Sequence, residues 1–297
     1  MKKGDKMEAK VRTVSAVLNA PAPHMVGDGF RVHNFFPSGY RIKMSPFFML
    51  DYNAKIEFSA RNEPRGVGVH PHRGFETVTI AYHGAVAHHD SAGNSGVIYP
   101  GDVQWMTAGS GILHKEYHEE EFSRKGGPFQ MVQLWVNLPA KFKMSPPKYQ
   151  DVKNQEMAKF VLPDESGVIE VIAGEYNGLK GSASTFSPLH VFNARLNKGG
   201  KAVFDFPFSY NTGFVVIEGS VKINRAEVAE TDQFVHFNND GALIGLEALE
   251  NSVVLVLSGE PIDEPIAQYG PFLMNTSEEI QQAISDYNQG KFGYLEE

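Results

Sequence analysis

Short runs of alternating or continuously apolar residues, separated by glycine and proline, recur along the first half of the chain. Residues 77–82 (TVTIAY) alternate and are rich in β-branched side chains, and residues 85–89 have the character of the returning strand of a hairpin. The run QMVQLWVNL at residues 130–138 is the clearest buried strand of this half. Turn residues at 99–102 and 108–111 separate further short strands. This pattern predicts an all-β fold.

The second half repeats this pattern of short strands. Strand-like runs, with glycine turns between them, occupy residues 168–174, 202–206, 212–220 and 253–257. His190 and His236 have no partner two residues away, so the sequence predicts a second barrel that holds no metal. The stretch at residues 140–149, which contains two adjacent prolines and three lysines, has the character of a linker. The predicted domains are therefore residues 11–140 and residues 141–297.

The chain closes with one predicted helix. Thr276 and Glu279 have the spacing of a capping box, in which a hydroxyl and a carboxylate three residues later satisfy the first backbone N–H groups. The apolar stripe that follows consists of Ile280, Ala283, Ile284 and Tyr287. Gly290 is expected to stop the helix. We expect the stripe to pack on a barrel wall, and a partner-binding face is the alternative.

Composition narrows the class of protein. The formal net charge of -8 argues against general affinity for nucleic acid, because lysine and arginine dominate phosphate binding; a local basic patch is the alternative. The chain has no cysteine, so any metal site must use nitrogen and oxygen ligands. No run approaches the ~20 apolar residues of a membrane span, and the first ten residues lead into no apolar signal-peptide region. We expect a cytoplasmic protein without membrane contact.

The candidate chemistry is concentrated in residues 69–121, which hold seven of the eleven histidines. His70 and His72 are separated by one residue, and so are His114 and Glu116. A strand directs residues i and i+2 to the same face, so each pair presents two donor groups side by side. If the two strands face each other inside a barrel, four ligands converge on one point.

Three imidazoles and one carboxylate suit a first-row transition metal and do not fit calcium or magnesium, which prefer oxygen ligands. Four protein ligands on an octahedral ion leave two positions for chemistry, whereas a closed tetrahedral set is typical of a structural site. The alternative is that these are ordinary surface or core histidines. Four paired residues at strand spacing within one short segment favour the metal site.

Several segments resemble a known family. The motifs HPHRGFETVT (70–79), PGDVQWMTAGSGILHKE (100–116), QLWVNLP (133–139), GEPIDEPIAQYGPF (259–272) and GKFG (290–293) strongly resemble the pirin family of bicupins. The resemblance runs through most of the chain. It implies two antiparallel β-barrels of the jelly-roll or cupin type with a C-terminal helix, and a metal in the N-terminal barrel only. Carried over by motif, the metal ligands are His70, His72, His114 and Glu116.

The carboxylate ligand has a competitor. The general cupin signature places a glutamate ligand shortly after the second histidine, which here is Glu76. In pirins the carboxylate that follows the last histidine takes this role, and its separation from His114 mirrors the first histidine pair, so we favour Glu116. Glu76 is then expected to be a hydrogen-bond partner that orients a ligating imidazole.

The resemblance also implies a function. Bacterial pirin-like proteins resemble quercetin 2,3-dioxygenases, which cleave a flavonol-like phenolic with O2, and Glu116 or Glu76 is expected to accept the phenolic proton. The expected cofactor is one divalent transition metal, with Fe(II) favoured and Ni, Cu, Mn, Co or Zn as alternatives. Phe47, Phe48, Trp105 and Phe129 are candidate pocket walls, and each is also a candidate core residue.

Two alternatives remain open from the sequence. Eukaryotic pirins resemble metal- or redox-sensing regulatory proteins that bind a protein partner, and a surface patch of Lys141, Lys143 and Lys148 would serve that role here. A cupin acting on another small molecule, such as an acireductone or another phenolic, is the second alternative, because fold membership does not determine the substrate.

Overall fold

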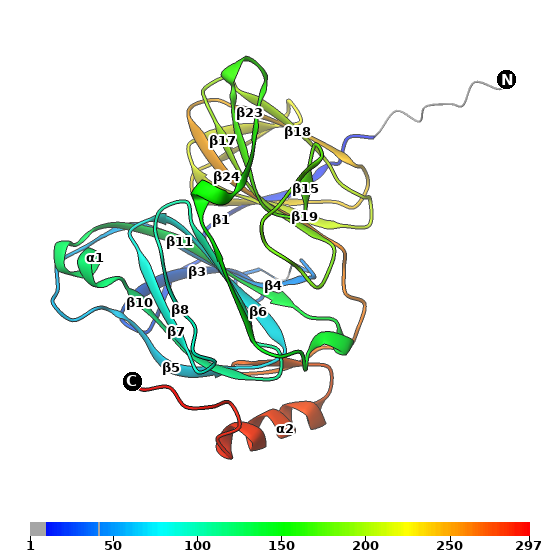
Figure 1. The fold of residues 1–297 in the computed structure, drawn as a ribbon. Coiled ribbons are helices and arrows are strands. Elements are labelled where there is room, and N and C mark those ends of the chain that lie inside the picture. Colours follow the sequence, from blue (N-terminus) through cyan, green and yellow to red (C-terminus); the bar gives the residue numbers. More distant parts are fainter. Residues whose placement is uncertain (1–9, 41) are drawn as a thin grey trace. The chain divides into compact units, whose positions relative to one another are not determined.

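The computed structural model describes residues 10–40 and 42–297, which form two compact units whose segments interleave along the chain. We call the unit made of residues 20–157, 181–188 and 261–297 the histidine barrel. We call the other unit, which contains the described residues 10–19 together with residues 158–180 and 189–260, the apolar barrel. Figure 1 shows the strands of each unit coloured along the sequence.

The histidine barrel is built from two antiparallel sheets. Its seven-stranded sheet has the order β12-β9-β6-β11-β4-β3-β2. The strands are β2 (His24–Val26), β3 (Phe30–Phe36), β4 (Phe47–Phe58), β6 (Phe75–His83), β9 (Val103–Thr107), β11 (Gly127–Asn137) and β12 (Lys148–Val152). Its four-stranded sheet has the order β5-β10-β7-β8, with β5 (Gly66–His72), β7 (Val86–Asp90), β8 (Ser95–Ile98) and β10 (Ile112–His118).

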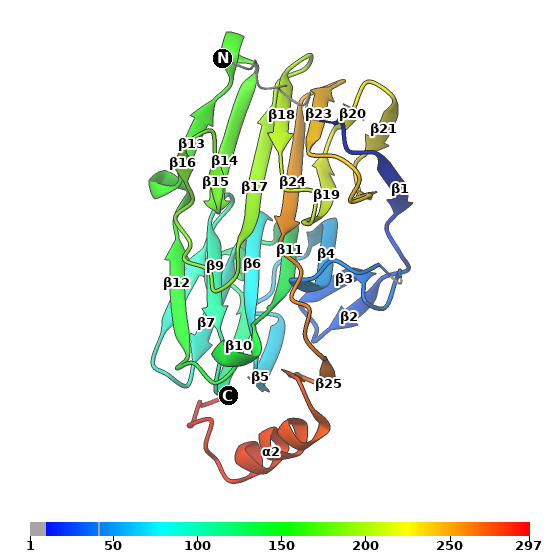
Figure 2. The same cartoon turned by 90° about the vertical axis from the view of Figure 1, so that its right-hand side faces the viewer.

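Shorter elements complete this unit. They are α1 (Glu120–Lys125), the 3-10 turns η1 (Ala140–Phe142) and η2 (Asn154–Glu156), the paired strands β25 (Ala267–Tyr269) and β26 (Phe272–Met274), and α2 (Ser277–Asn288). Figure 2 shows α2 beyond β25, at the end of the histidine barrel. Phe272 also forms a β-bridge with Arg73, the residue after His72, so the C-terminal segment reaches the strand that carries the first histidine pair.

The apolar barrel repeats the two-sheet plan around an apolar core. Its larger sheet has the order β1-β22-β19-β24-β17-β14-β13, and its four-stranded sheet has the order β18-β23-β20-β21. The elements are β1 (Val14–Asn19), β13 (Ala158–Val161), η3 (Pro163–Glu165), β14 (Gly167–Ala173), β15 (Glu175–Tyr176), β16 (Leu179–Lys180), β17 (Leu189–Leu196), β18 (Lys201–Asp205), β19 (Asn211–Glu218), β20 (Ser220–Ile223), β21 (Glu227–Glu230), β22 (Gln233–Phe237), β23 (Leu243–Ala248) and β24 (Ser252–Gly259). Buried Phe192, Phe204 and Phe214 belong to its continuous core cluster.

The predicted strands and turns are confirmed, with ends shifted by a few residues. The alternating run at 77–82 lies within β6, which is buried on both faces, and the run at 130–138 corresponds to β11. Contacts group β1 with the apolar barrel and α2 with the histidine barrel. Such grouping does not define domains by itself, so the division into residues 11–140 and 141–297 stays a prediction.

The predicted C-terminal helix is confirmed as α2. The Thr276 hydroxyl accepts a hydrogen bond from the Glu279 N–H, and the Glu279 carboxylate accepts one from the Thr276 N–H, so the capping box is complete. Gly290 follows the helix with a φ of 73°, a conformation that favours glycine. The buried face also includes Asp286, whose carboxylate accepts hydrogen bonds from Arg73 and Lys291.

Within the described residues no helix is both long and apolar enough to cross a membrane. The prediction that the first ten residues form no signal peptide concerns residues 1–9 in particular, and these lie outside the described part of the chain.

Thr276→Ala should lower the free energy of unfolding by about 1 kcal/mol, because the Glu279 N–H loses its acceptor. Urea unfolding followed by circular dichroism measures the change. Ser277→Ala is the matched control, since it removes a neighbouring hydroxyl outside the capping box and should change the free energy by less than about 0.5 kcal/mol. Equal losses in the two variants would contradict the assigned cap.

Candidate metal centre

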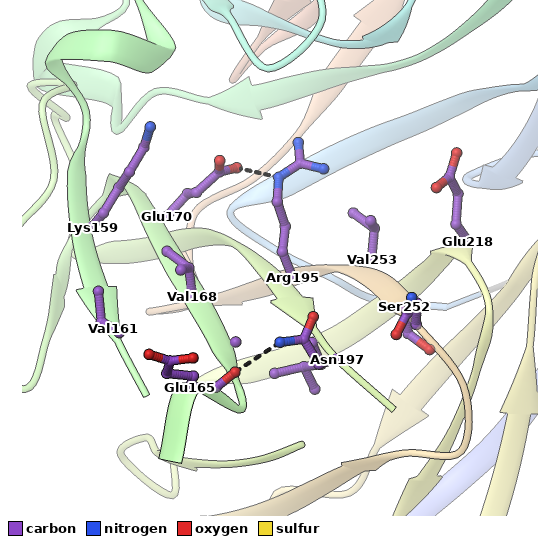
Figure 3. A pocket seen from close by; sticks show the side chains of 13 residues that line it. Lys159, Val161, Glu165, Val168, Glu170, Arg195, Asn197, Glu218, Ser252 and Val253 are labelled. Carbon is purple, nitrogen blue, oxygen red and sulfur yellow. Dashed lines mark hydrogen bonds and ion pairs between the residues drawn. The ribbon is translucent and has the colours of Figure 1, made fainter. Parts of the chain in front are cut away.

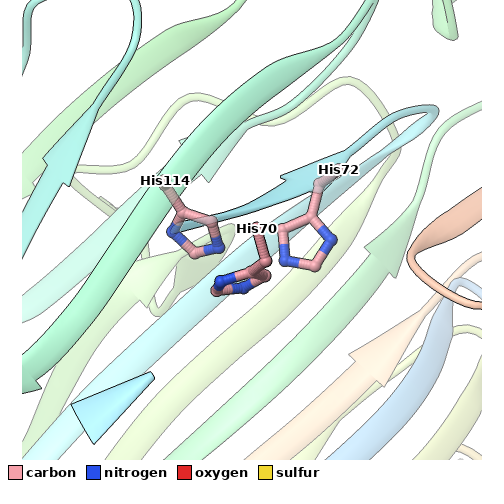
Figure 4. A group of neighbouring side chains, drawn as sticks. All are labelled: His70, His72 and His114. Carbon is pink, nitrogen blue, oxygen red and sulfur yellow. The ribbon is translucent and has the colours of Figure 1, made fainter. Parts of the chain in front are cut away.

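Two neighbouring antiparallel strands carry the predicted ligands. His70 and His72 end β5, and His114 lies on β10 directly opposite His70. The ring centroids are 4.3 Å apart for His70 and His114, and 4.8 Å apart for His72 and each of the other two. Figure 4 shows the three imidazoles turned toward one another. The spacing at i and i+2 and the pairing of the strands thus bring these three side chains together.

Glu116 lies close to this trio but in a second, overlapping group. The potential ligand atoms of His70, His72 and His114 lie within 4.8 Å of one another, and so do those of His88, His114 and Glu116. His114 is common to both groups. The sequence predicts His88 only as part of a strand, although two consecutive histidines in a buried hairpin strand are a signal for a polar site. The full ligand set of three histidines and Glu116 stays a prediction.

In each of the three histidines, Nδ1 has a hydrogen-bond partner inside the protein, so Nε2 is the nitrogen available to a metal. Nδ1 of His70 lies 2.8 Å from the Gly68 carbonyl oxygen, and Nδ1 of His72 lies 3.4 Å from that of Pro271. A carbonyl only accepts, so both Nδ1 atoms carry the proton and both Nε2 atoms keep a lone pair. Nε2 of His114 is buried and has no hydrogen-bond partner among the described residues. Two Nε2 atoms with a lone pair and a third that is buried without a partner fit a transition metal.

Burial keeps two of these imidazoles neutral. Desolvation, with a contribution from the neighbouring His70, lowers the pKa of both His72 and His114 well below the ordinary value of 6.5. A neutral imidazole is the form that binds a metal, so neither side chain must lose a proton first near neutral pH.

Three neutral donors from the facing sheet hold the Glu116 carboxylate. Thr79 donates to Oε1 at 3.1 Å, Gln133 donates to Oε2 at 2.7 Å, and Gln104 also donates to Oε1. Thr79 lies directly opposite both glutamines across the neighbouring strands, so all three side chains share one face. The sequence pattern does not single out either glutamine, although each is a polar residue inside an otherwise apolar strand.

Glu76 lies on the opposite face of β6 from Thr79, because successive strand residues alternate. Its carboxylate accepts a hydrogen bond from Thr107 at 2.7 Å, and the described residues show no bond from it to an imidazole. Burial raises the pKa of Glu76 to about 7. Its role as a catalytic residue or as a partner of a ligating histidine stays a prediction that this geometry does not support.

The aromatic side chains nearest the histidines differ from most of those predicted. Trp135 and Phe75 lie 5.4 Å and 5.0 Å from the His72 ring, centroid to centroid. Of the predicted walls, Phe48 stacks on Trp135 at 6.4 Å, whereas Phe47, Trp105 and Phe129 are fully buried core residues. Trp135 was missed because it lies in a run that reads as continuous core.

The predicted lysine patch is wrong at one position. Lys143 is buried, and its Nζ donates to the carbonyls of Gly74 and Leu273 and to Asn137. Burial lowers its pKa to about 8. A side chain whose three donors are used inside the protein joins loops and presents no charge to a partner.

The space at the candidate centre is small. A cavity of about 30 Å³ lies beside His70 and Glu116 and is lined further by Val67, Met131 and Gln133. A larger hollow of about 530 Å³ lies on the apolar barrel, where Arg195 pairs with Glu170 at 3.0 Å (Figure 3). It contains neither of the two histidine groups, whereas the smaller cavity is lined by His70 and Glu116.

Comparisons with known proteins agree with this architecture. The family model Pirin matches residues 29–136, and the model Pirin C-terminal cupin domain matches residues 191–293. A Pseudomonas aeruginosa protein named "Putative quercetin 2,3-dioxygenase" is 48% identical over 270 residues, which cover 91% of this chain and 94% of that protein. "Pirin-like protein 2" of Arabidopsis thaliana is 38% identical over 277 residues, which cover 90% and 82% of the two chains.

A solved structure is similar along almost the whole chain. The crystal structure of quercetin 2,3-dioxygenase from Acinetobacter baumannii has a TM-score of 0.91 and 47% sequence identity, covering 97% of this chain and 100% of that chain. The predicted all-β fold of two cupin barrels with a C-terminal helix is therefore confirmed.

The buried Glu76 predicts a pH-dependent stability. Its pKa is about 7 in the folded protein and near 4.5 in the unfolded chain. The neutral carboxyl group therefore stabilises the folded state fully below about pH 4.5, and this contribution to the free energy of unfolding is lost as the pH rises through 7. Glutamine stays neutral throughout. The stability of Glu76→Gln relative to wild type should therefore increase by about 2 kcal/mol between pH 5 and pH 8.

Urea unfolding of the metal-free proteins at the two pH values measures this difference. Glu57→Gln, at an exposed position on β4, is the matched control and should show no such increase. If the free energies of unfolding of Glu76→Gln and wild type differed by the same amount at pH 5 and pH 8, this would contradict the raised pKa.

Proposed function

Because this chain belongs to the pirin family of bicupins, we propose that it is a metal-dependent oxidoreductase of the quercetin 2,3-dioxygenase type. Its substrates would be a flavonol-like phenolic and O2, as the names of its bacterial relatives suggest. The observation that supports the proposal is the trio of buried or half-buried imidazoles whose Nδ1 atoms are all engaged and whose potential ligand atoms lie within 4.8 Å of one another.

We propose His70, His72, His114 and Glu116 as the residues that hold the metal, with Fe(II) favoured over Ni, Cu, Mn, Co and Zn. When bound, such a metal supplies Lewis acidity toward a phenolic oxygen and one-electron chemistry toward O2. Because the ligands are imidazoles and a carboxylate, they fit any of these ions, and the preference for iron follows from the family.

Glu116 is the residue we propose to receive the phenolic proton. Its two carboxylate oxygens already accept hydrogen bonds from Thr79, Gln104 and Gln133, so the carboxylate is held in place without a positive partner among these contacts. Trp135 and Phe75 beside His72 exclude water from this side of the site.

The cavity sets a condition on this function. Pockets for drug-sized ligands have volumes of about 300 to 1,000 Å³, and the cavity beside His70 has about 30 Å³. A flavonol therefore requires that lining side chains move, or that only the edge bearing its oxygen atoms enters. His70 is the only half-buried member of the trio, which makes its side the direction of approach.

The same small cavity favours a second candidate, a metal- or redox-sensing regulatory protein that binds a protein partner. A sensor needs space only for the ion and small ligands such as water. In that case Lys141 and Lys148 remain as charges for a partner surface, because Lys143 is buried.

Quercetin turnover separates the two candidates. The protein, loaded anaerobically with Fe(II), Ni(II), Cu(II) or Mn(II) and then exposed to air, should consume quercetin and release carbon monoxide with at least one metal. His72→Ala should reduce quercetin consumption and carbon monoxide release to the level without protein, because it removes one of the three imidazoles proposed to bind the metal. His236→Ala, a histidine of the apolar barrel, should retain the wild-type rate. Absence of turnover with every metal, together with metal-dependent capture of a protein partner, would favour the regulatory protein.

Bound metal distinguishes the two carboxylates. Glu116→Gln should reduce the metal content after gel filtration far more than Glu76→Gln, because Glu116 lies within 4.8 Å of His114 and Glu76 faces the other side of β6. The amounts are measured by mass spectrometry of the metal. The reverse order would show that Glu76 is the ligand.

A further inference from the structure

Behind His114 lies a pair of buried polar residues that the proposed reaction does not use. His88 and Asp90 belong to β7, which pairs with β10 so that Asp90 lies opposite His114 and His88 lies opposite Glu116. Their side chains are fully buried. Being two residues apart on one strand, they share the face that is turned toward His114.

Hydrogen bonds connect these residues into a chain. Oδ2 of Asp90 lies 3.2 Å from Nε2 of His88, and Nδ1 of His88 lies 3.4 Å from Nδ1 of His114. The other carboxylate oxygen of Asp90 accepts hydrogen bonds from the Ala92 N–H and the Asn94 N–H. The loop that follows β7 therefore fixes Asp90, the end of this hydrogen-bond series that lies away from His114.

With His88 in its neutral form, the acceptor role of the carboxylate sets the direction of each hydrogen bond in this series. A carboxylate accepts, so Nε2 of His88 donates to Asp90, and a neutral His88 then has only a lone pair on Nδ1. That lone pair must accept from Nδ1–H of His114. His114 consequently keeps its lone pair on Nε2, the buried atom that lacks a hydrogen-bond partner among the described residues.

From this geometry we propose that Asp90 and His88 are positioning residues, which hold His114 in the metal-binding tautomer and direct the negative charge of Asp90 toward the metal. The inference rests on the metal site of the proposed function. His70 and His72 have only carbonyl oxygens at Nδ1, so His114 is the ligand that a carboxylate supports. Groups that orient a ligating histidine commonly change metal affinity 10- to 100-fold when they are removed.

A direct ligand role for His88 is the competing interpretation, since its ring lies within the second group of potential ligands. Both of its nitrogens are engaged, one by Asp90 and one by His114, so it has no lone pair for a metal while the chain is intact. Its ring is also stacked on Tyr149, with centroids 4.9 Å apart and planes 19° apart, which holds it in this orientation.

Asp90→Asn tests the proposal with almost no change in shape. The asparagine oxygen can still accept from the loop N–H groups. Its amide nitrogen would replace Oδ2, losing the hydrogen bond from the Asn94 side chain at 3.0 Å, and would donate to Nε2 of His88 and place the proton on Nδ1. Two N–H groups would then face each other between His88 and His114. Competition with a chromophoric chelator should show a 10- to 100-fold lower affinity for Co(II).

His89→Gln is the matched control. His89 precedes Asp90 on β7 but faces the other side, where its Nδ1 lies 2.9 Å from the Tyr117 hydroxyl, so its Co(II) affinity should stay within about twofold of wild type. If Asp90→Asn does not fold, His88→Phe serves instead, because phenylalanine keeps a ring next to Tyr149 and removes both nitrogens. It should lower the affinity to a similar extent.

Two further readouts separate positioning from a structural or a direct role. In the iron-loaded protein, Asp90→Asn should raise the Fe(III)/Fe(II) potential, because losing a nearby negative charge weakens Fe(III) binding more than Fe(II) binding. Each tenfold difference between these two losses of affinity corresponds to about 59 mV. X-ray absorption of the Co(II) protein should give three imidazole ligands in both wild type and His88→Phe.

The outcomes are distinguishable. Wild-type affinity and potential in Asp90→Asn would overturn the proposal, and so would the loss of one imidazole ligand in His88→Phe. A wild-type protein that binds none of the metals would instead contradict the proposed metal site itself.

Discussion

The pairing of β5 with β10 is the constraint on which the rest of the site depends. Because His114 lies opposite His70, three imidazoles meet within one small volume, and each has its Nδ1 engaged by a fixed partner. Strand pairing fixes the backbone positions, and the Nδ1 partners fix the ring orientations. A shift of one residue in this register would turn the histidines to the opposite face, so the pairing of the two strands and the existence of the site are one property.

The two barrels use the same plan with different interiors. The apolar barrel has a continuous core of aliphatic and aromatic side chains, in which the Tyr176 hydroxyl donates to the Val203 carbonyl. The histidine barrel buries polar groups such as Thr79, Gln104, His88 and Asp90, and these are stable there because each one is hydrogen-bonded. Such a network is less tolerant of substitution than an apolar core, because removing one partner leaves another buried group unsatisfied.

Local sequence patterns predicted the strands, the helix cap and the three-histidine cluster, because these depend on residues close together in the chain. They did not predict which residue lies opposite which across a sheet. The positions of His88 beside Glu116 and of Asp90 beside His114 follow from the β7–β10 register, which spacing alone leaves open. For the same reason Glu76 was expected near the histidines, although the alternation of β6 turns it away from them.

The carbonyl that engages His72 belongs to Pro271, 199 residues further along the chain. During synthesis, the ribosome releases the strands that carry the three histidines long before this residue emerges. The nascent protein therefore holds the His72 ring without the carbonyl that engages its Nδ1, and the complete orientation of the three imidazoles is one of the final events of its maturation.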